Sequence, residues 1–492
     1  MKFTYKKIAD LCYIGVVCGV LFLPFAALPF VKSTDDSTEN RTLAKFPQFK
    51  QEDQQINSNY FMELDAWFSD HFALRPQMVT AYGKLLYSGL HDTSNRDVIL
   101  GKENWLYYAD TADDAVGIPT ISTNGAKHIA NSLQLIADYA AQYGTDFIFV
   151  PAPNKASIYP QYLPNRYLST GQKNNLDRIS DALSTTSPEL LCDIRGVLRN
   201  AADAQPDKLL YHKLDTHWNG HGAMLGFSAM MQSFQRSDHD FPFAAVTETQ
   251  DWEGDLWNML FPSIQNPDRN MVYDIPQTYE YIRRFRSMDD LNIQTSCTNG
   301  EGKLLMFRDS FGRAVIPLLS ECFAQCTFIR SDRLTLDRLA SDSYSHLICE
   351  IVERNLPQYL QYAPVLPAMT AEDIPVGTSF TVVADHQKQP VAPTIYATEE
   401  SGYLHIYGTY HDALSDSDAV YCQVGDQIYH AFPCYEAELM TESKVLDNGF
   451  SLYLPTDIAE KEDSVRILVR RGDQYFDLGT NTIIQIYEKE QT

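Results

Sequence analysis

The chain has 492 residues and carries 39 Lys and Arg against 64 Asp and Glu, a formal net charge of −25. Its length predicts two or three domains. Its acidic balance argues against DNA or RNA as a partner, and against adhesion of the soluble part to anionic lipid, because both need clustered cationic side chains.

Residues 1–31 predict a membrane anchor. Residues 11–31 contain no charged side chain, and about 20 apolar residues cross a bilayer. Lysines precede this segment and acidic residues from Asp35 onward follow it, which places the N-terminus inside and the bulk of the chain outside the cytoplasm. A cleaved signal peptide is the alternative, since Pro24 could end a shorter apolar core. We favour the uncleaved anchor on the length of the segment.

Residues 32–57 are polar and predict a stalk. Across residues 58–364, predicted helices alternate with predicted strands, which implies a mostly parallel sheet covered on both faces. Residues 236–300 are irregular and aromatic, and we interpret them as an insertion over the core. The periodicity predicts helices over 60–75, 126–143, 174–184, 220–234, 312–322 and 356–362, and strands over 146–151, 190–194, 303–307, 327–330 and 346–352.

Residues 365–492 have a different texture, with short alternating runs separated by Gly, Asp and Asn turns. This pattern predicts a β-sandwich. Its tyrosines could stack on sugar rings, although packing within the core or across strands explains such residues more often. The tyrosines in question are Tyr396, Tyr403, Tyr407 and Tyr410.

The nine cysteines leave their pairing open. Outside the cytoplasm, Cys422 could bond to Cys434, and Cys297 to Cys322 or Cys326; buried free thiols are an equal alternative. No Cys-x-x-Cys pair suggests a metal. His217 and His221 have a spacing that zinc can use but lack the Glu of the helical zinc motif, so we expect no metal and no other cofactor.

Two short motifs carry the chemistry of the chain. Residues 213–219 supply Asp215 and His217, and residues 307–312 supply Ser310. A serine hydroxyl is a poor nucleophile unless a histidine takes its proton and a carboxylate orients that histidine. Both motifs lie between a predicted strand and a predicted helix, where parallel sheets carry their active sites. The sequence therefore predicts a serine acyl-transfer site built from two distant loops.

Each residue also has a simpler explanation when it is taken alone. Asp-Ser before a helix is a common helix cap, Asp215 could cap the helix that follows it, and His217 could be a surface histidine in a polar loop. The combination of the two motifs at equivalent strand ends favours the catalytic interpretation.

Five further residues are candidates for substrate binding. Asn154 could donate to an oxyanion and Lys155 could attract an anionic substrate, or both could decorate a Pro-rich turn. Trp218 could form a wall of the site or simply pack. Arg308 and Arg313 flank the serine and could bind substrate, although a solvated arginine is the simpler expectation.

Short motifs in chain order also resemble those of a known family. They are Glu39-Asn40-Arg41-Thr42-Leu43 with Phe46-Pro47, Phe68-Ser69-Asp70-His71-Phe72 with Arg75, Gly101-Lys102 with Trp105-Leu106-Tyr107, Pro153-Asn154-Lys155 with Tyr159-Pro160, Asp215-Thr216-His217-Trp218 and Arg308-Asp309-Ser310-Phe311. Together they resemble the DHHW family and the alginate O-acetyltransferases of the SGNH-hydrolase-like superfamily. Two positions depart from the pattern: Thr216 stands where the family name implies His, and Arg308 replaces the Gly of the Gly-Asp-Ser block.

The resemblance implies a three-layer SGNH-hydrolase-like catalytic domain over residues 58–364, with Asp215, His217 and Ser310 as its triad. It also implies that the β-domain over 365–492 could bind carbohydrate, and that a membrane acyltransferase partner supplies the acetyl group. We therefore expect an outward-facing, membrane-anchored O-acetyltransferase acting on a cell-surface or exported polysaccharide. A carbohydrate acetylesterase and a non-catalytic polysaccharide-binding surface protein are the alternatives.

Overall fold

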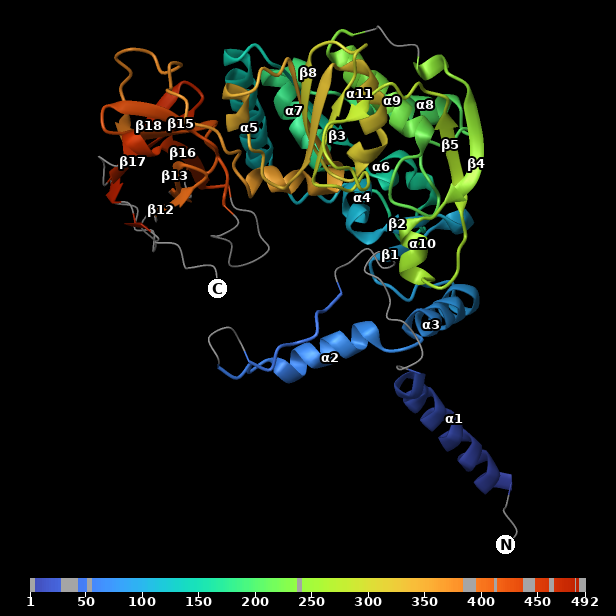
Figure 1. Ribbon diagram of the computed structural model, residues 1–492. Helices are drawn as coiled ribbons and strands as arrows, with labels where there is room; N and C mark the ends of the chain where they lie inside the picture. Colours follow the sequence, from blue (N-terminus) through green and yellow to red (C-terminus); the bar gives the residue numbers. More distant parts are fainter. Residues whose placement is uncertain are drawn as a thin grey trace.

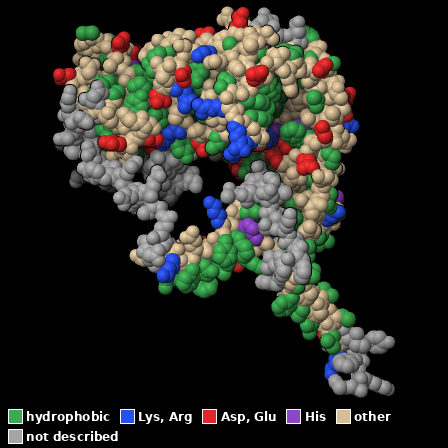
Figure 2. Space-filling view, viewed as in Figure 1, with side chains coloured by type: hydrophobic (Ala, Val, Ile, Leu, Met, Phe, Trp, Pro, Cys, Tyr) green, Lys and Arg blue, Asp and Glu red, His purple; other side chains and the backbone are tan. Residues whose placement is uncertain are grey.

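The structure is a computed structural model that describes residues 5–27, 43–50, 55–236, 241–383, 395–410, 414–436, 447–459, 464–482 and 484–485. Figure 1 shows three N-terminal helices below an α/β part, with a strand-rich C-terminal part beside it. Acidic side chains are scattered over the visible face, whereas Lys and Arg side chains gather near its middle (Figure 2).

The N-terminal helices are α1 (Tyr5–Ala27), α2 (Tyr60–His71) and α3 (Arg75–Leu90). The single helix predicted over 60–75 is divided because Leu74 has φ 65°, which ends one helix and begins the next. In the part of the chain that the structure describes, no helix combines the length and the apolar character that spanning a membrane requires. The predicted anchor is therefore not confirmed.

A six-stranded sheet organises the α/β part, in the order β3-β10-β8-β9-β7-β6. The first four of these strands are parallel, and β7, near one edge, is antiparallel to both of its neighbours, β9 and β6. The strands are β3 (Asp146–Ala152), β6 (Glu280–Tyr281), β7 (Asn292–Ser296), β8 (Lys303–Arg308), β9 (Gln325–Arg330) and β10 (His346–Val352).

Helices cover both faces of this sheet because its strands are apolar on both sides. In β3, Phe147 and Phe149 join one buried cluster while Ile148 and Val150 join another, as the alternation of side chains along a strand requires. Helices α5 (Thr123–Gln142) and α7 (Asn175–Thr186) contribute to the first cluster, and α8 (Ile194–Ala204), α9 (Gly220–Ser233) and α11 (Ile316–Cys322) to the second. The predicted layered α/β domain is confirmed.

Two sequence predictions fail within this domain. Residues 190–194 form no strand, because the carboxylate of Asp193 accepts from the Gly196 N–H and starts α8; Leu191 makes one isolated bridge to Phe149. Of the segment 236–300, which we expected to be irregular, the described residues 241–300 are more regular than predicted. Strands β6 and β7 extend the main sheet, and β4 (Val246–Trp252) pairs with β5 (Asp268–Tyr273) in a separate hairpin.

The C-terminal part is rich in strands that form two sheets, in the orders β11-β18-β17-β14-β15 and β16-β13-β12-β19. One buried cluster draws side chains from both sheets. Tyr407 and Tyr410 are buried, and Tyr396 packs against Tyr407 across the strand pair, so these rings are used in packing. The strands are β11 (Thr381–Val382), β12 (Ile395–Glu400), β13 (Tyr403–Thr409), β14 (Ala419–Val424), β15 (Gln427–Ala431), β16 (Gly449–Pro455), β17 (Ser464–Arg471), β18 (Gln474–Thr482) and β19 (Ile484–Gln485).

All nine cysteines are free thiols. Cys422 lies opposite Tyr429 in the β14–β15 pair, so it does not staple that hairpin to Cys434. The possible disulfides are thus absent from the structure, and burial is the alternative it adopts.

Candidate active site

Ser310 lies just beyond the C-terminal end of β8, at the start of the short 3₁₀ helix η7 (Phe311–Ala314). The Asp309 carboxylate fixes this turn, because it accepts from the N–H of Phe311 at 2.8 Å and from the N–H of Val352 at 2.7 Å. Among the described residues, nothing accepts a hydrogen bond from the N–H of Ser310. This N–H is therefore available to an incoming oxygen.

Asp215 and His217 lie in the loop before α9. Asn219 caps that helix, and an isolated bridge between Tyr211 and Trp218 closes the loop. The Nδ1 atom of His217 lies 2.7 Å from Asp215 Oδ1, and its Nε2 atom lies 2.8 Å from Ser310 Oγ. The two distant motifs thus meet in one hydrogen-bonded chain from carboxylate to imidazole to hydroxyl.

Four N–H groups are directed at the Asp215 carboxylate. The backbone N–H and Nδ1 of His217 approach Oδ1, while Trp252 Nε1 and the backbone N–H of Asp255 donate to Oδ2, both at 3.0 Å. Burial alone would raise the pKa of Asp215, but the charge and hydrogen bond of His217 hold it below its ordinary value. Asp215 is therefore anionic and orients the imidazole with Nδ1 protonated and Nε2 facing the serine.

Asp255 is a second carboxylate at this site, and the sequence reasoning missed it. It accepts from the backbone N–H of Thr216 at 2.8 Å and from its hydroxyl at 2.6 Å, and lies 3.6 Å from His217 Nδ1. Burial and the neighbouring Asp215 charge raise the pKa of Asp255. Nothing local in the sequence marks Asp255 or Trp252, because both reach the triad through tertiary folding of a segment read as irregular.

Asp215, His217 and Asp255 each place one potential metal-ligating atom within 4.8 Å of the others. His217 Nδ1 lies within hydrogen-bond distance of Asp215 Oδ1, at 2.7 Å, and backbone and indole N–H groups already occupy the Asp215 oxygens. These N–H groups take up the carboxylate oxygens that a cation would need as ligands. The arrangement therefore fits an oriented imidazole better than a metal site.

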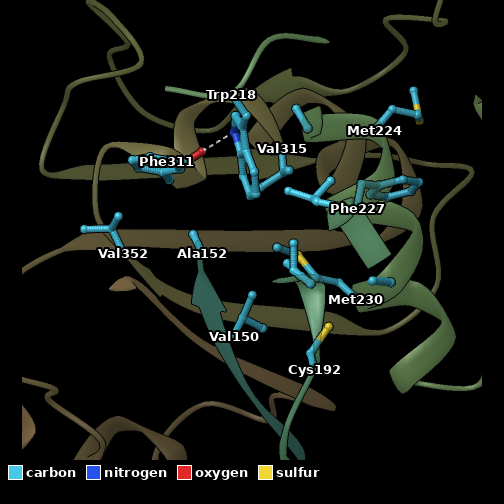
Figure 3. Close-up of a cluster of buried hydrophobic side chains, with 14 of the residues drawn as sticks. Val150, Ala152, Cys192, Trp218, Met224, Phe227, Met230, Phe311, Val315 and Val352 are labelled. Atoms are coloured by element: carbon cyan, nitrogen blue, oxygen red, sulfur yellow. Dashed lines mark hydrogen bonds between the residues drawn. The ribbon is translucent and has the colours of Figure 1, made fainter. Parts of the chain in front are cut away.

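Trp218 is buried in the core beneath the site. Its indole Nε1 donates to the carbonyl of Phe311 at 3.2 Å, and its ring packs beside Val315 and Phe227 (Figure 3). It links the histidine loop to the serine turn from below. Because Trp218 also lines a cavity at the site, it is both a packing residue and part of a wall.

The side chains of Asn154 and Lys155 are buried and bonded within the protein, which differs from the exposed, substrate-facing placement expected for them. Lys155 is 3% exposed, and its ammonium donates to the carbonyls of His212, Lys213 and Asp215. Burial lowers its pKa to about 8. Asn154 is 1% exposed and donates to Glu353 and Asp114. Both residues hold the framework of the site rather than a ligand.

Arg308 and Arg313 are also held by the protein. Arg308 is buried rather than solvated, and it donates to the carbonyls of Met288, Asp290 and Asp309; burial lowers its pKa to about 10. Arg313 donates to the Ser310 carbonyl at 3.2 Å and pairs with Asp289. Both line cavities at the site, but their donors are largely used in fixing the serine turn.

Glu350 gives a prediction for stability. This buried carboxyl in β10 accepts from the N–H of Asp309 at 3.0 Å, and burial together with the Asp309 charge raises its pKa well above the ordinary value. The folded state therefore binds more protons than the unfolded state at neutral pH, so stability falls as pH rises above the unfolded pKa of about 4.5. Glu350→Gln should remove this slope and raise the unfolding free energy at pH 8 by roughly 1–2 kcal/mol.

Urea unfolding at pH 5 and pH 8 measures the effect. Glu189→Gln, at an exposed position, serves as the control and should leave the difference between the two pH values unchanged. An equal pH dependence in wild type and Glu350→Gln would show that Glu350 is not held neutral.

The site is thus an Asp–His–Ser chain at the C-terminal edge of a mostly parallel α/β sheet, which is the arrangement of a serine acyl-transfer site. Residues 98–280, which include Asp215 and His217, match the sequence profile of the SGNH hydrolase-like domain of acetyltransferase AlgX. Over this range, the resemblance to alginate O-acetyltransferase-like proteins is confirmed.

Individual relatives are distant. A probable alginate O-acetylase AlgJ of Pseudomonas putida is 23% identical over 171 residues, which cover 33% of this chain and 42% of the relative. The chain thus matches less than half the length of that curated protein. Among solved structures, Bacillus cereus PatB1 aligns with a TM-score of 0.42 at 16% identity, covering 53% of this chain and 97% of that one. A DHHW family protein from Eubacterium siraeum aligns with a TM-score of 0.37 at 16% identity, covering 46% and 84%.

Proposed function

We propose that the chain is an O-acetyltransferase in which Ser310 carries the acetyl group to a hydroxyl of a polysaccharide outside the cytoplasm. The observation that carries this proposal is the hydrogen-bonded chain from Asp215 through His217 to Ser310. The match to an acetyltransferase domain and the name of the P. putida relative support acetyl as the group and polysaccharide as the acceptor.

In the first half of the reaction, Ser310 Oγ attacks the carbonyl carbon of the acetyl donor while His217 Nε2 takes the hydroxyl proton. The resulting imidazolium is stabilised by Asp215. The oxyanion can accept a hydrogen bond from the backbone N–H of Ser310. The carbonyl then re-forms, the bond to the donor breaks, and His217 returns the proton to the leaving group. This leaves acetyl-Ser310 and a neutral imidazole.

In the second half, a sugar hydroxyl loses its proton to His217 Nε2 and attacks the acetyl-serine. Collapse of the tetrahedral intermediate releases the O-acetyl sugar, and the proton returns to Ser310 Oγ. Water in place of the sugar would give the esterase reaction. The proposal includes an N-terminal membrane anchor over residues 1–31 and a membrane acyltransferase that delivers the donor. It also assigns residues 58–364 to catalysis and residues 365–492 to a β-sandwich able to bind carbohydrate.

Trapping of the acyl-enzyme tests the proposal. Wild type incubated with p-nitrophenyl acetate and quenched in acid should gain the mass of one acetyl group on the peptide that contains Ser310, and Ser310→Ala should gain none. Equal release of p-nitrophenol by the two proteins, with no acetyl adduct on either, would contradict the proposal that the chain is an enzyme acting through Ser310. Oligosaccharide acceptors added to the same reaction separate the two fates, because only a transferase yields an acetylated sugar.

A further inference from the structure

Ser310 lines two cavities with different linings. One, of about 450 Å³, is mostly apolar and also includes His217, Met271, Val272 and Pro276. The other, of about 210 Å³, has a mixed lining in which apolar and aromatic side chains alternate with polar and charged ones, among them Arg354, Asn355 and Gln358; we call it the polar cavity. A nucleophile shared by two cavities can receive a group from one side and pass it to a molecule on the other.

Most charges in the polar cavity are already matched within the protein. Arg308 donates to three backbone carbonyls, and both oxygens of Asp309 accept backbone N–H groups. Arg330 pairs with Asp289 at 3.1 Å. Asp332, an exposed residue, also lines this cavity and contributes an anion.

Arg354 is the exception. Within the described part of the chain, no residue accepts a hydrogen bond from its guanidinium or forms an ion pair with it. The group lies over two aromatic rings, 5.5 Å from the centroid of Tyr108 and 5.8 Å from that of Phe311. The Phe311 ring is also 4.9 Å from the His217 ring, so the free cation stands one aromatic ring away from the general base.

The position of Arg354 is set by a buried network. The preceding residue, Glu353, is fully buried and accepts from the Asn154 backbone N–H at 2.9 Å and from Asn174 Nδ2 at 3.0 Å, with Arg195 3.4 Å away. This network fixes the start of η9 (Glu353–Leu360) at the C-terminal end of β10. Because the backbone of Arg354 is fixed and its guanidinium lies over two aromatic rings, the side chain is already ordered before a ligand binds. It therefore loses less conformational entropy on binding, which favours a ligand site.

From this arrangement we propose that the polar cavity binds the acceptor sugar and that Arg354 recognises an anionic group on that sugar. The proposal rests on the acetyltransferase function above. A planar guanidinium with no anionic partner among the described residues suits a carboxylate, with which it forms two parallel hydrogen bonds, and it can also bind a sulfate ester. Asn355 and Gln358 project from the same helix and supply amide groups for the ring hydroxyls. The apolar cavity is left for the acetyl donor.

Direct binding tests this assignment without depending on turnover. The protein carries Ser310→Ala, and isothermal titration uses three probes: an oligogalacturonate, a sulfated oligosaccharide and an uncharged cello-oligosaccharide. Adding Arg354→Gln should raise the Kd of the better-bound anionic probe roughly tenfold and leave the Kd of the uncharged probe unchanged. Arg166→Gln, which removes an exposed arginine outside the cavity, is the charge-matched control and should change neither value.

The outcomes separate the sources of the anion and the two proposals. Preference for the carboxylated or the sulfated probe identifies the group that Arg354 recognises. Three results would overturn the assignment of Arg354: equal weakening of charged and uncharged probes, no weakening at all, or a preference of the Ser310→Ala protein with Arg354 intact for the uncharged probe. An absence of acetyl-Ser310 in the trapping experiment would instead overturn the acyltransferase, and the binding result would stand apart from it.

Discussion

Asp215→Asn is expected to lower kcat for acetyl transfer by about 10³–10⁴-fold, because every group around this carboxylate is a donor. If the amide nitrogen takes the place of Oδ2, it faces the N–H groups of Trp252 and Asp255, so donors oppose donors and both hydrogen bonds are lost. If it takes the place of Oδ1, it donates to His217 Nδ1 and moves the imidazole proton to Nε2. An Nε2 that carries a proton cannot accept one from Ser310, so the nucleophile is no longer activated.

Asp255→Asn is the matched control for this prediction. Asp255 accepts from both the N–H and the hydroxyl of Thr216. The side-chain oxygen of an asparagine can still accept from the N–H, and its amide nitrogen can donate to the hydroxyl oxygen, so both hydrogen bonds can be kept. The hydrogen bond that the backbone N–H of residue 255 donates to Asp215 does not depend on the side chain and is retained. We expect less than a tenfold loss of kcat. Steady-state rates with p-nitrophenyl acetate, with thermal unfolding to verify the fold, measure both variants. A similar loss in the two would mean that the carboxylates share one role and that Asp215 is not the dedicated orienter.

The sequence revealed the parts of the site that are close together along the chain. Asp215 and His217 are two residues apart, and Ser310 follows a strongly apolar strand, so strand-end reasoning could bring the two loops to one edge of the sheet. Trp252 and Asp255 could not be found in this way. Their contribution depends on one indole and one backbone N–H that reach Asp215 only after the β4–β5 region has folded over the site.

Buried cations were the main failure of the sequence reasoning. A lysine or arginine beside a catalytic motif suggests a substrate anion, since such side chains are seldom buried. In this protein Lys155 and Arg308 are each 3% exposed or less because backbone carbonyls of irregular loops satisfy them. Arg354, for which the described residues provide no hydrogen-bond acceptor, carries no motif of its own. Sequence position cannot distinguish these cases, because the distinction depends on which loops lie within reach of the side chain.

Lys155→Met should lower the unfolding free energy by about 2–4 kcal/mol and kcat by roughly 10–100-fold. The change removes the donor shared by the carbonyls of His212, Lys213 and Asp215, at a cost of about 1–3 kcal/mol for each buried acceptor left unpaired, offset in part by no longer burying a charge. The activity falls because the loop that carries Asp215 and His217 loses its anchor, and small displacements at a reacting centre are costly. Lys84→Met, at an exposed position in α3, should change neither quantity.

The pH dependence distinguishes loss of this particular contact from general damage. Burial lowers the pKa of Lys155 to about 8, below its unfolded value near 10.5, so the unfolded state binds more protons between these limits. The wild-type unfolding free energy should therefore rise from pH 8 to pH 10 relative to that of Lys155→Met, because the variant has no amine to titrate. Urea unfolding of both proteins across this range measures the difference. A constant difference would mean that the ammonium keeps its ordinary pKa and that the three carbonyls compensate fully for its burial. The histidine loop would then be held by a permanent cation rather than by an amine that titrates near the upper end of the physiological range.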